Sequence, residues 1–479
     1  MRDAARGASA WLALAVALVL LNSALTFENH WPTPLPRLVW PPGVSIELAL
    51  VLLALVAWTA RGRRLAADAR VATALAATTL AFALVRYGIV TAPALYGRPV
   101  DLYWDAPHVG NVARMLAAAA GPLPTVGALL ATGLVLVALY ALLRAAWGRV
   151  LHGLARPAER RTTTVLAAVV LAAGIVDLAG VPPGFARVTT PVVASTAAQL
   201  RLVADGWRGA REAPVDESAT DAADAPKATA DPRFHALAGD DVLLVFVESY
   251  GSVAWTNPAF AARLAGPRAG LARAVADTGR AMVSATVVAP TFGGNSWLSH
   301  ASLLAGTAVR DPGRHARVLK SRRPTLVHAF ERAGYRSVAL MPGLRQAWPE
   351  GAFYGFDTLL DARTLDYRGP EFGWWRIPDQ YALAALDAKA GDGGPRFVFF
   401  PTITSHAPFR PTPPYQRDWS RLLGAAPYGP EAAAALALAP DWTELAPAYG
   451  DTLAYVHEWL AGWLTLRAAA DVTLVVLGD

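Results

Sequence analysis

The stretch VLLVFVESYG, from Val242 to Gly251, decides the fold of the second half of the chain. Its first six residues are all apolar, and a short uninterrupted run of this kind is typical of a strand buried on both faces of a parallel sheet. The run ends at Glu248, which places a carboxylate at the carboxyl end of the predicted strand. The stretch therefore predicts a central strand with a polar group at its end.

Four further runs have the same character: Ala281–Val288, Ser337–Met341, Phe397–Pro401 and Val472–Leu477. Stretches with helical character lie between them, at Thr325–Ala333, Tyr381–Ala388 and Thr452–Ala468. Strands that alternate with helices predict an α/β domain with a mostly parallel sheet and helices on both faces. In such sheets ligands bind beyond the carboxyl ends of the strands, so we expect a functional site there.

The first half of the chain has the composition of a membrane domain. Apolar stretches cover residues 7–27, about 43–60, 71–92, 115–143 and 162–182. A helix needs about 20 residues to cross a bilayer, so these stretches predict five spans. Three of them contain a charged residue, Glu47, Arg86 or Asp177, which we expect near the membrane interface.

Arginines predict the orientation of these spans. They precede the first span and lie between spans two and three and between spans four and five, whereas the alternate loops hold few. The positive-inside rule then places the N-terminus in the cytoplasm and everything after about residue 183 outside. The first span lacks a small-residue cleavage site, so we interpret it as a membrane span and not as a signal peptide.

A connector is predicted between the two halves. Residues 183–212 are mixed, with a possible interfacial helix around Ala194–Trp207, and Ala213–Pro232 has the composition of a flexible tether. The predicted organisation is a transmembrane domain over 1–182, a connector and linker over 183–233, and an extracytoplasmic domain over 234–479.

Composition excludes several classes of function. The chain has no cysteine, which rules out disulfides, thiolate metal sites and a cysteine nucleophile. No cluster of arginines sits beside interleaved aromatic residues, so nucleic acid is not a predicted partner.

The segment from Pro290 to His300, PTFGGNSWLSH, adds candidate chemistry. A glycine pair followed by hydroxyl residues and a helix fits a nucleophile at a helix N-terminus. Glu248 and Asp479 each follow a predicted strand, and carboxylates suit a divalent metal that activates a hydroxyl. Taken singly, each feature also fits a solvated loop carboxylate, a turn or a helix cap.

Together these motifs resemble the alkaline phosphatase/sulfatase superfamily, in particular its membrane branch of lipoteichoic acid synthases, which are phosphoglycerol transferases, and phosphoethanolamine transferases. The resemblance covers residues 234–479, and five preceding spans match that branch. The matching pieces are Glu248-Ser-Tyr-Gly, Ser296 to Gly306, Tyr354-Gly-Phe-Asp357, Thr404-Ser-His-Ala-Pro-Phe409 and Gly478-Asp479.

The resemblance implies roles for individual residues. Glu248, Ser296 and Asp479 would bind one or two divalent metal ions, Zn or Mn, and Ser296 would also be the nucleophile. His406 would contact the transferred head group. Arg345 and Trp348 are candidate substrate contacts, although their spacing matches the family only loosely.

Thr291, Ser296 and Ser299 compete for the nucleophile's role. Members of the superfamily place the nucleophile ten residues before the glycine that closes a Leu-Leu-x-Gly turn. That turn is Leu303-Leu-Ala-Gly306 here, which favours Ser296.

The resemblance also implies partners and a location. A membrane lipid would donate the head group to an envelope glycan or lipid, at a bacterial inner membrane. The chain stops at Asp479, one residue before the family's metal-binding histidine, so we expect the sequence to be a fragment. The alternatives are a sulfatase and an inactive membrane protein that keeps the fold. A sulfatase's modification motif needs a proline and an arginine where this chain has Leu298 and His300.

Overall fold

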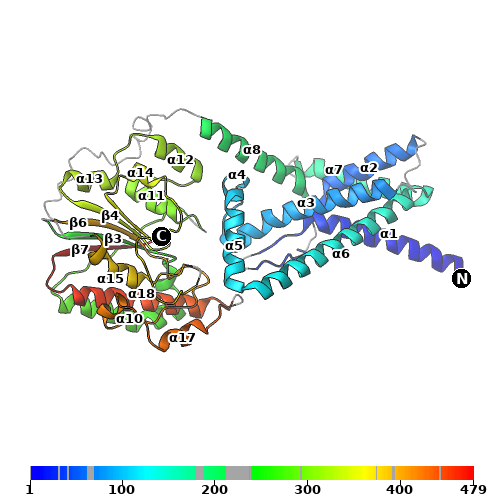
Figure 1. Ribbon diagram of the computed structural model, residues 1–479. Helices are drawn as coiled ribbons and strands as arrows, with labels where there is room; N and C mark the ends of the chain where they lie inside the picture. The colour runs from blue at the N-terminus through cyan, green and yellow to red at the C-terminus, as the bar shows by residue number, and fades with distance from the viewer. Residues whose placement is uncertain are drawn as a thin grey trace. The chain divides into compact units, whose positions relative to one another are not determined.

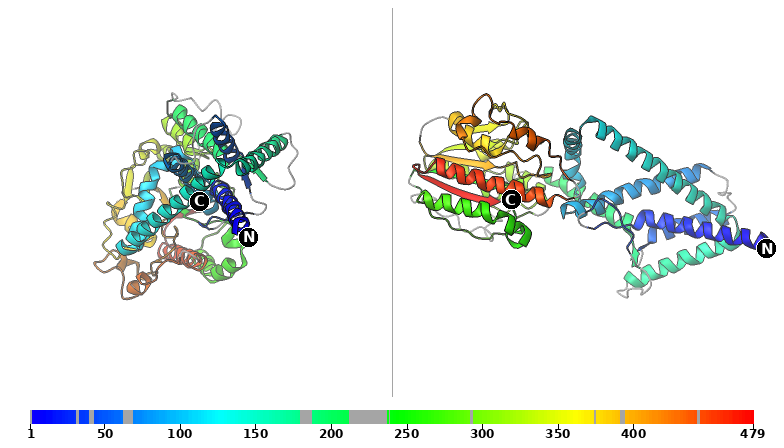
Figure 2. Two further views of the ribbon diagram at one scale, coloured as in Figure 1. Left: turned by 90° about the vertical axis from the view of Figure 1, so that its right-hand side faces the viewer. Right: turned by 90° about the horizontal axis from the view of Figure 1, so that it is seen from below.

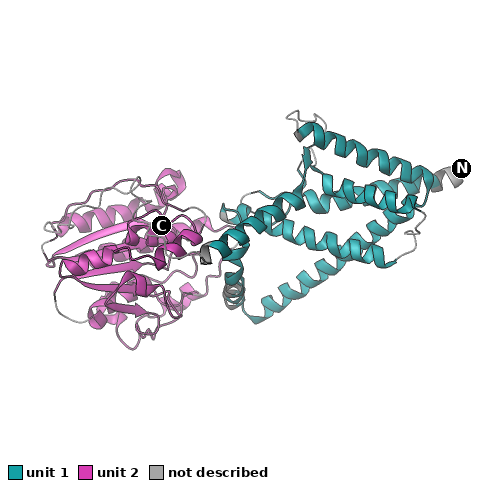
Figure 3. Ribbon diagram, turned by 90° about the horizontal axis from the view of Figure 1, so that it is seen from above, with its two compact units in different colours: residues 1–208 teal, residues 209–479 magenta. Residues whose placement is uncertain are grey.

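The computed structural model describes residues 2–30, 33–39, 43–61, 69–178, 187–211, 237, 239–291, 294–373, 375–390, 394–441 and 444–479. The chain forms two compact units, Met1–Arg208 and Gly209–Asp479 (Figure 3). The division falls within the predicted connector over 183–233, whereas the predicted tether Ala213–Pro232 lies outside the described residues.

The N-terminal unit is helical. Its elements are α1 (Arg2–Thr26), α2 (Ile46–Ala60), α3 (Ala69–Tyr96), α4 (Leu102–Asp105), the short 3₁₀ helix η1 (Ala106–His108), α5 (Val109–Ala120), α6 (Pro122–Leu154), α7 (Pro157–Leu178) and α8 (Pro191–Arg211). Helix α6 packs against α1 and α3, and α2 packs against α7. Leu21, Leu143 and Leu154 are fully buried between these helices, so one apolar core joins them.

Three of these helices are long and apolar enough to cross a membrane, at Gly7–Thr26, Ala69–Leu95 and Pro122–Leu154. The five predicted spans are therefore reproduced only in part. The second predicted span forms α2, which has 15 residues and is only about 22 Å long at 1.5 Å per residue, short of a bilayer core. The fourth predicted span is reproduced by α6, which begins only at Pro122 because Gly121 separates it from α5. The fifth forms α7, with Glu159 in its first turn.

A short parallel pairing ties the start of α2 to the start of α8. Strand β1 (Gly43–Ser45) pairs with β2 (Arg187–Thr189). Glu47 accepts hydrogen bonds from the amides of Val192 and Val193, both at 3.0 Å, which satisfies N–H groups in the first turn of α8. The charge within the second predicted span thus has a structural role. Helix α8 also confirms the helix expected around Ala194–Trp207.

The C-terminal unit is built on a five-stranded, all-parallel sheet with the strand order β5-β4-β6-β3-β7 (Figure 1). The strands are β3 (Asp241–Val247), β4 (Arg336–Met341), β5 (Thr358–Asp361), β6 (Arg396–Pro401) and β7 (Val472–Gly478). The mostly parallel sheet and four of the predicted strands are confirmed, and β5 is a strand that we did not predict.

The predicted strand Ala281–Val288 is wrong. These residues are not part of the sheet, and the side chains of Val283 and Val288 are 96% and 97% exposed. A strand is stabilised by hydrogen bonds to a neighbour, and the apolar, β-branched composition of this run gives only the propensity. None of the described strands pairs with it.

Helices cover both faces of the sheet. The unit contains α9 (Val253–Thr256), α10 (Pro258–Asp277), α11 (Trp297–Ala305), α12 (Pro312–Lys320), α13 (Leu326–Arg332), α14 (Gly351–Tyr354), α15 (Asp379–Ala390), α16 (Trp419–Leu422), α17 (Glu431–Leu436) and α18 (Ala446–Leu466). The helices predicted at Thr325–Ala333, Tyr381–Ala388 and Thr452–Ala468 are confirmed as α13, α15 and α18. Helices α10 and α18 lie side by side on one face (Figure 2), and α11 and α13 lie on the other.

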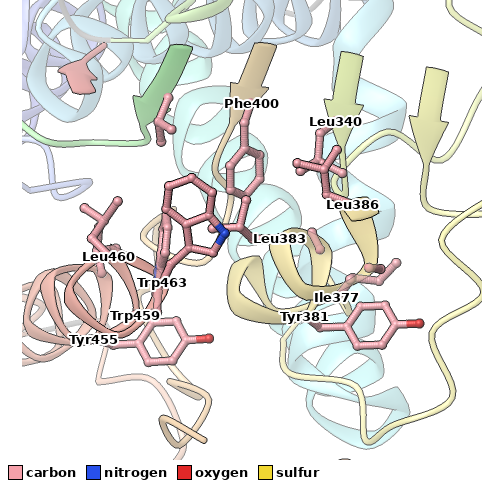
Figure 4. Packing of buried hydrophobic residues seen from close by; sticks show 14 of the residues in the cluster. Leu340, Ile377, Tyr381, Leu383, Leu386, Phe400, Tyr455, Trp459, Leu460 and Trp463 are labelled. Carbon is pink, nitrogen blue, oxygen red and sulfur yellow. The ribbon is translucent and has the colours of Figure 1, made fainter. Parts of the chain in front are cut away.

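Strand β3 is buried on both sides because its alternate residues enter two cores. Val245 faces the larger core with α15 and α18, where Phe400 and Trp459 are fully buried (Figure 4). Leu244 faces the smaller core with α11 and α13. This two-sided burial explains why the strand is an unbroken apolar run, and it fixes the position of Glu248 at the sheet's carboxyl edge.

Candidate functional site

Two predicted metal ligands meet at the carboxyl edge of the sheet. Val247 pairs with Gly478 in the ladder between β3 and β7, so the following residues, Glu248 and Asp479, leave neighbouring strands side by side. The amide of Ser249 donates to Oδ1 of Asp479 at 2.9 Å, and the Asp479 side chain is 2% exposed. Parallel pairing therefore brings together two carboxylates that are 231 positions apart in the chain.

The two carboxylates disfavour each other's charge. Burial raises the pKa of Glu248 well above its usual value, and the neighbouring Asp479 carboxylate raises it further. The hydroxyl of Ser249, which donates to Oε1 of Glu248 at 3.1 Å, opposes this shift only in part. A pair of this kind needs either a shared proton or a cation to be stable.

The loop after β6 holds Glu248 in place through its backbone. The amide of Glu248 donates to Oγ1 of Thr402 at 3.0 Å, and Oγ of Ser405 donates to the carbonyl of Glu248 at 2.7 Å. Asp379, the fully buried first residue of α15, accepts from the amides of Ile403 and Thr404 at 2.8 and 2.9 Å. Helix α15 therefore holds the loop after β6, and this loop in turn holds Glu248.

His406 follows in the same loop. Its Nδ1 lies 2.8 Å from the carbonyl of Ala407, and a carbonyl can only accept, so Nδ1 carries the proton. Burial lowers the pKa of His406, against smaller raising effects of the Ala407 carbonyl and the Asp479 carboxylate. The ring is therefore neutral at pH 7, with Nε2 as its acceptor, and it lies within electrostatic range of Asp479.

Helix α11 faces the carboxylate pair with its first turn. His300 Nε2 lies 3.3 Å from Oδ2 of Asp479. Ser296 has helical backbone angles and precedes His300 by four residues, so the two lie on the same side of the helix. Ser296 is half-buried, and its hydroxyl does not cap the helix, whereas the hydroxyl of Ser299 lies 3.0 Å from that of Thr291.

Left-handed backbone conformations mark the same three segments. Five described non-glycine residues have positive φ, and two of them, Asp366 and Arg376, are not in these segments. Of the other three, Ser249 (60°) follows Glu248 directly and Asn295 (60°) precedes Ser296 directly. Phe409 (65°) lies three residues after the predicted substrate-binding histidine. Such conformations cost on the order of 1–3 kcal/mol each and gather at functional sites.

The two loosely matched residues lie in the segment between β4 and α14. Arg345 is exposed. The ring of Trp348 stacks on Tyr354, with centroids 5.5 Å apart, and also contacts Phe356, so it supports the smaller core. The substrate-binding roles of Arg345 and Trp348 stay predictions.

Sequence reasoning missed the supporting residues. His300 carries a signal in the sequence, because it lies one helical turn beyond Ser296. Asp379 and Thr402 carry none, and Ser405 lies within a matched motif that implied no role for it. Their role depends on β6 and α15 lying next to β3, which only the tertiary structure sets.

The described residues fit a metal ion only in part. Within the described ranges, no three His, Asp or Glu side chains form a group that could hold a metal. The Glu248–Asp479 pair nevertheless brings two carboxylates together, and carboxylate oxygens are a ligand type that divalent cations bind. The metal site therefore stays a prediction.

The chain matches no family model, no curated protein and no solved structure. The superfamily resemblance therefore stays a prediction from the sequence motifs.

Proposed function

We propose that this chain is a membrane-anchored enzyme whose C-terminal unit transfers or hydrolyses phosphate-ester head groups through Ser296. The observation that carries the proposal is the pair formed by the half-buried Glu248 and the Asp479 side chain, which lies against the first turn of the helix that Ser296 begins. A carboxylate pair, a hydroxyl at a helix N-terminus and a neutral histidine supply a ligand set, a nucleophile and a proton acceptor at one edge.

The proposed reaction has two displacement steps. Oγ of Ser296 attacks phosphorus, the bond from phosphorus to the lipid oxygen breaks, and that oxygen takes up a proton while the serine proton passes to a base or solvent. An acceptor hydroxyl or water then attacks phosphorus, the bond to Oγ breaks, and Ser296 regains its proton. A divalent cation, Zn or Mn, held by Glu248, Asp479 and Ser296 would stabilise the negative charge on these oxygens.

His406 suits the second step. With its proton on Nδ1, the ring accepts hydrogen bonds at Nε2, so it can receive the proton of an incoming hydroxyl. A membrane lipid as donor and an envelope glycan or lipid as acceptor are part of the proposal, and nucleic acid is not.

The test uses the full-length chain with a chromogenic phosphodiester and intact-mass measurement. Ser296→Ala should abolish both turnover and any covalent adduct, whereas His406→Ala should slow turnover and let the adduct accumulate. Ser420→Ala is the control, since its exposed hydroxyl bonds only to Oδ1 of Asp418, outside the site. Normal turnover of Ser296→Ala with a dead Thr291→Ala would move the nucleophile to Thr291.

Two further outcomes separate the rival activities. Turnover of an aryl sulfate in place of the phosphodiester would favour a sulfatase. Normal behaviour of every variant, or a complete lack of turnover in the unmodified chain, would favour a membrane protein without catalysis.

The membrane orientation is tested separately. The proposal places the C-terminal unit outside an inner membrane, with a cytoplasmic N-terminus. The predicted count of five spans requires α2 and α7 to cross as well, beyond the three helices that are long and apolar enough. A periplasm-active phosphatase fused after Ala213 should be active and one fused after Gly153 inactive, and the reverse result would refute the orientation.

A further inference from the structure

The segment Ala281–Val288, which we call the apolar run, is exposed along its whole length. Met282, Val283, Val287 and Val288 are the four most exposed large apolar side chains that the structure describes in the C-terminal unit. Contiguous exposed apolar surface is uncommon on soluble proteins and marks a surface that contacts another protein or a membrane. The apolar run therefore indicates an interaction surface.

Both ends of the apolar run are held by the rest of the unit. Before the run, the guanidinium of Arg280 donates to the carbonyls of Arg467 and Ala470, both at 2.8 Å. After the run, the hydroxyl of Thr291 lies 3.0 Å from that of Ser299 in α11. Hydrogen bonds on either side therefore fix where the run lies, so its exposure is not that of a loose chain end.

The charges that follow the apolar run are unevenly distributed. No Asp, Glu, Lys or Arg occurs from Ala281 to Val309. Residues 310–332, which we call the basic segment, then carry seven arginines and lysines and two carboxylates, a net charge of +5. Over residues 234–479 the 22 arginines and lysines balance the 22 aspartates and glutamates, so the rest of the predicted domain carries −5. An uncharged stretch thus continues directly into a local excess of cations.

The structure brings the start of the basic segment next to α11. Helix α12 packs along α11 (Figure 1). The ring of Trp297, which is exposed in the first turn of α11, contacts that of His315 in α12 edge-on, with centroids 4.6 Å apart. The guanidinium of Arg314 donates to Oγ1 of Thr307, just after α11, at 3.1 Å. Helix α11 therefore joins the end of the apolar run to the cations of α12.

A membrane surface is the partner that matches this combination. Segments that bind at a bilayer surface combine apolar side chains, which enter the interface, with lysines and arginines, which are attracted to anionic lipids. The same chain carries three described helices that are long and apolar enough to cross a membrane. A bilayer that holds these helices is present at a high effective concentration for the rest of the chain.

We propose that the apolar run docks the C-terminal unit on a membrane surface, with its side chains in the bilayer interface and cations of the basic segment against anionic head groups. The contact is with the lipid surface as a whole and involves no substrate, so it does not rest on the proposed function. Docking of this kind holds the first turn of α11, and with it Ser296, at the level of the head groups.

Lipid contact is tested with single fluorescent labels, which the absence of cysteine allows. Val288→Cys places a label in the apolar run. Ala425→Cys places a control label at an exposed position after α16, which packs on the other face of the sheet. The full-length proteins are reconstituted in nanodiscs of phosphatidylcholine and phosphatidylserine that contain a nitroxide-labelled lipid. The nitroxide should quench the label at position 288 and leave the control label bright, whereas equal quenching at the two positions would overturn the proposal.

Removal of apolar side chains tests the insertion itself. Val283→Ser combined with Val287→Ser, in the chain labelled at position 288, should abolish quenching by the nitroxide lipid, because these exposed side chains are the ones that enter the interface. Unfolding in urea should be unaffected, since exposed side chains contribute little to the fold. Unchanged quenching would refute the insertion. A label at position 288 that neither the nitroxide lipid nor aqueous iodide quenches would also refute it, because protein would then cover the apolar run.

Removal of cations tests the electrostatic part. Arg310→Gln combined with Lys320→Gln removes two exposed cations and should lower the ratio of docked to undocked units about tenfold on bilayers that contain phosphatidylserine. Arg273→Gln combined with Arg368→Gln removes the same charge from exposed positions outside the basic segment and should change the ratio less than about twofold. Equal losses in the two double variants would show a general effect of net charge and would contradict the role of the basic segment.

A catalytic variant separates this inference from the proposed function. Ser296→Ala should dock as the unmodified chain does, because the contact involves no reaction. Turnover without docking would refute the inference and leave the proposed function standing. Docking without turnover would support the inference and count against the proposed function.

Discussion

Two charged regions of the C-terminal unit place like charges in opposite environments. The acidic region, Glu248, Asp379 and Asp479, gathers three carboxylates beside the carboxyl ends of β3, β6 and β7, where burial raises the pKa of Glu248 and of Asp379. The basic segment, residues 310–332, holds its cations mostly at the surface, on two helices and their connection. Buried like charges need a proton or a cation to coexist, whereas exposed like charges stay ionised and are weakened by salt.

The largest difference between the two regions is expected in metal affinity when one carboxylate is replaced in each region. Glu248→Ala should lower metal affinity by more than about 100-fold, because even residues that only support metal ligands contribute 10- to 100-fold. Glu350→Ala, which removes a carboxylate beside the basic segment, should leave metal content unchanged. Elemental analysis of the full-length proteins is the measurement, and unchanged metal in Glu248→Ala would refute the predicted site.

A pH titration should distinguish two buried aspartates, Asp379 and Asp361, whose pKa values the fold shifts in opposite directions. Burial raises the pKa of Asp379 to about 6. Since an unfolded aspartate titrates near 3.9, the folded state binds more protons between about pH 4 and 6, and stability falls by about 3 kcal/mol as pH rises through that window. Asp379→Asn should remove this part of the pH dependence, as measured by urea unfolding followed by tryptophan fluorescence.

Asp361 is the matched control for this titration. Burial acts to raise its pKa, but hydrogen bonds from Thr364 and Arg363 outweigh it and lower the pKa. The Asp361 carboxylate therefore stabilises the fold at pH values above the pKa that it has in the unfolded chain, and this stabilisation is lost as the pH falls. Asp361→Asn should consequently lower the free energy of unfolding most at neutral pH. The same pH dependence in both variants would show that burial does not govern Asp379.

Supporting hydrogen bonds in the acidic region should matter more than surface hydroxyls. Thr402→Val keeps the side-chain shape but leaves the amide of Glu248 without its acceptor, which should cost about 1–3 kcal/mol and weaken metal binding about tenfold. Thr465→Val, at an exposed hydroxyl, should change the free energy of unfolding by less than about 0.5 kcal/mol. Equal effects in urea unfolding would contradict the role assigned to the loop.

The smallest effect is expected on the free energy of unfolding when exposed arginines of the basic segment are replaced. Arg322→Ala and Arg332→Ala should each alter the free energy of unfolding by less than about 0.5 kcal/mol, because both side chains are exposed. Calorimetric unfolding is the measurement. A loss of more than about 2 kcal/mol would contradict this and would mean that these arginines hold the fold together.

Composition alone could not distinguish two apolar runs that have different structures. Val242–Val247 and Ala281–Val288 are both rich in apolar and β-branched residues, and both were predicted to be strands. The first lies between β6 and β7 and is buried on both sides, while Val283 and Val288 of the second are almost fully exposed. Strand propensity is local, but a ladder requires a neighbour that only the folded chain provides.

Local sequence patterns were limited in the same way for the N-terminal helical unit. Hydropathy located the apolar segments of the N-terminal unit. It did not show that Gly121 separates α5 from α6 or that α2 has only 15 residues. Glu47, which we expected at the membrane interface, caps the amides at the start of α8, a contact between residues about 145 positions apart. Helix length and capping depend on backbone hydrogen bonds that hydropathy does not describe.

Sequence alone determined the α/β class, four of the five strands and the two strand ends that carry Glu248 and Asp479, because apolar runs and strand ends are local patterns. The proximity of these carboxylates, the support from Asp379 and the contact between His300 and Asp479 were decided by the tertiary structure. The physical reason is that strand order is not local. Placing β3 between β6 and β7 brings together residues more than 150 positions apart, and their burial then sets their charge.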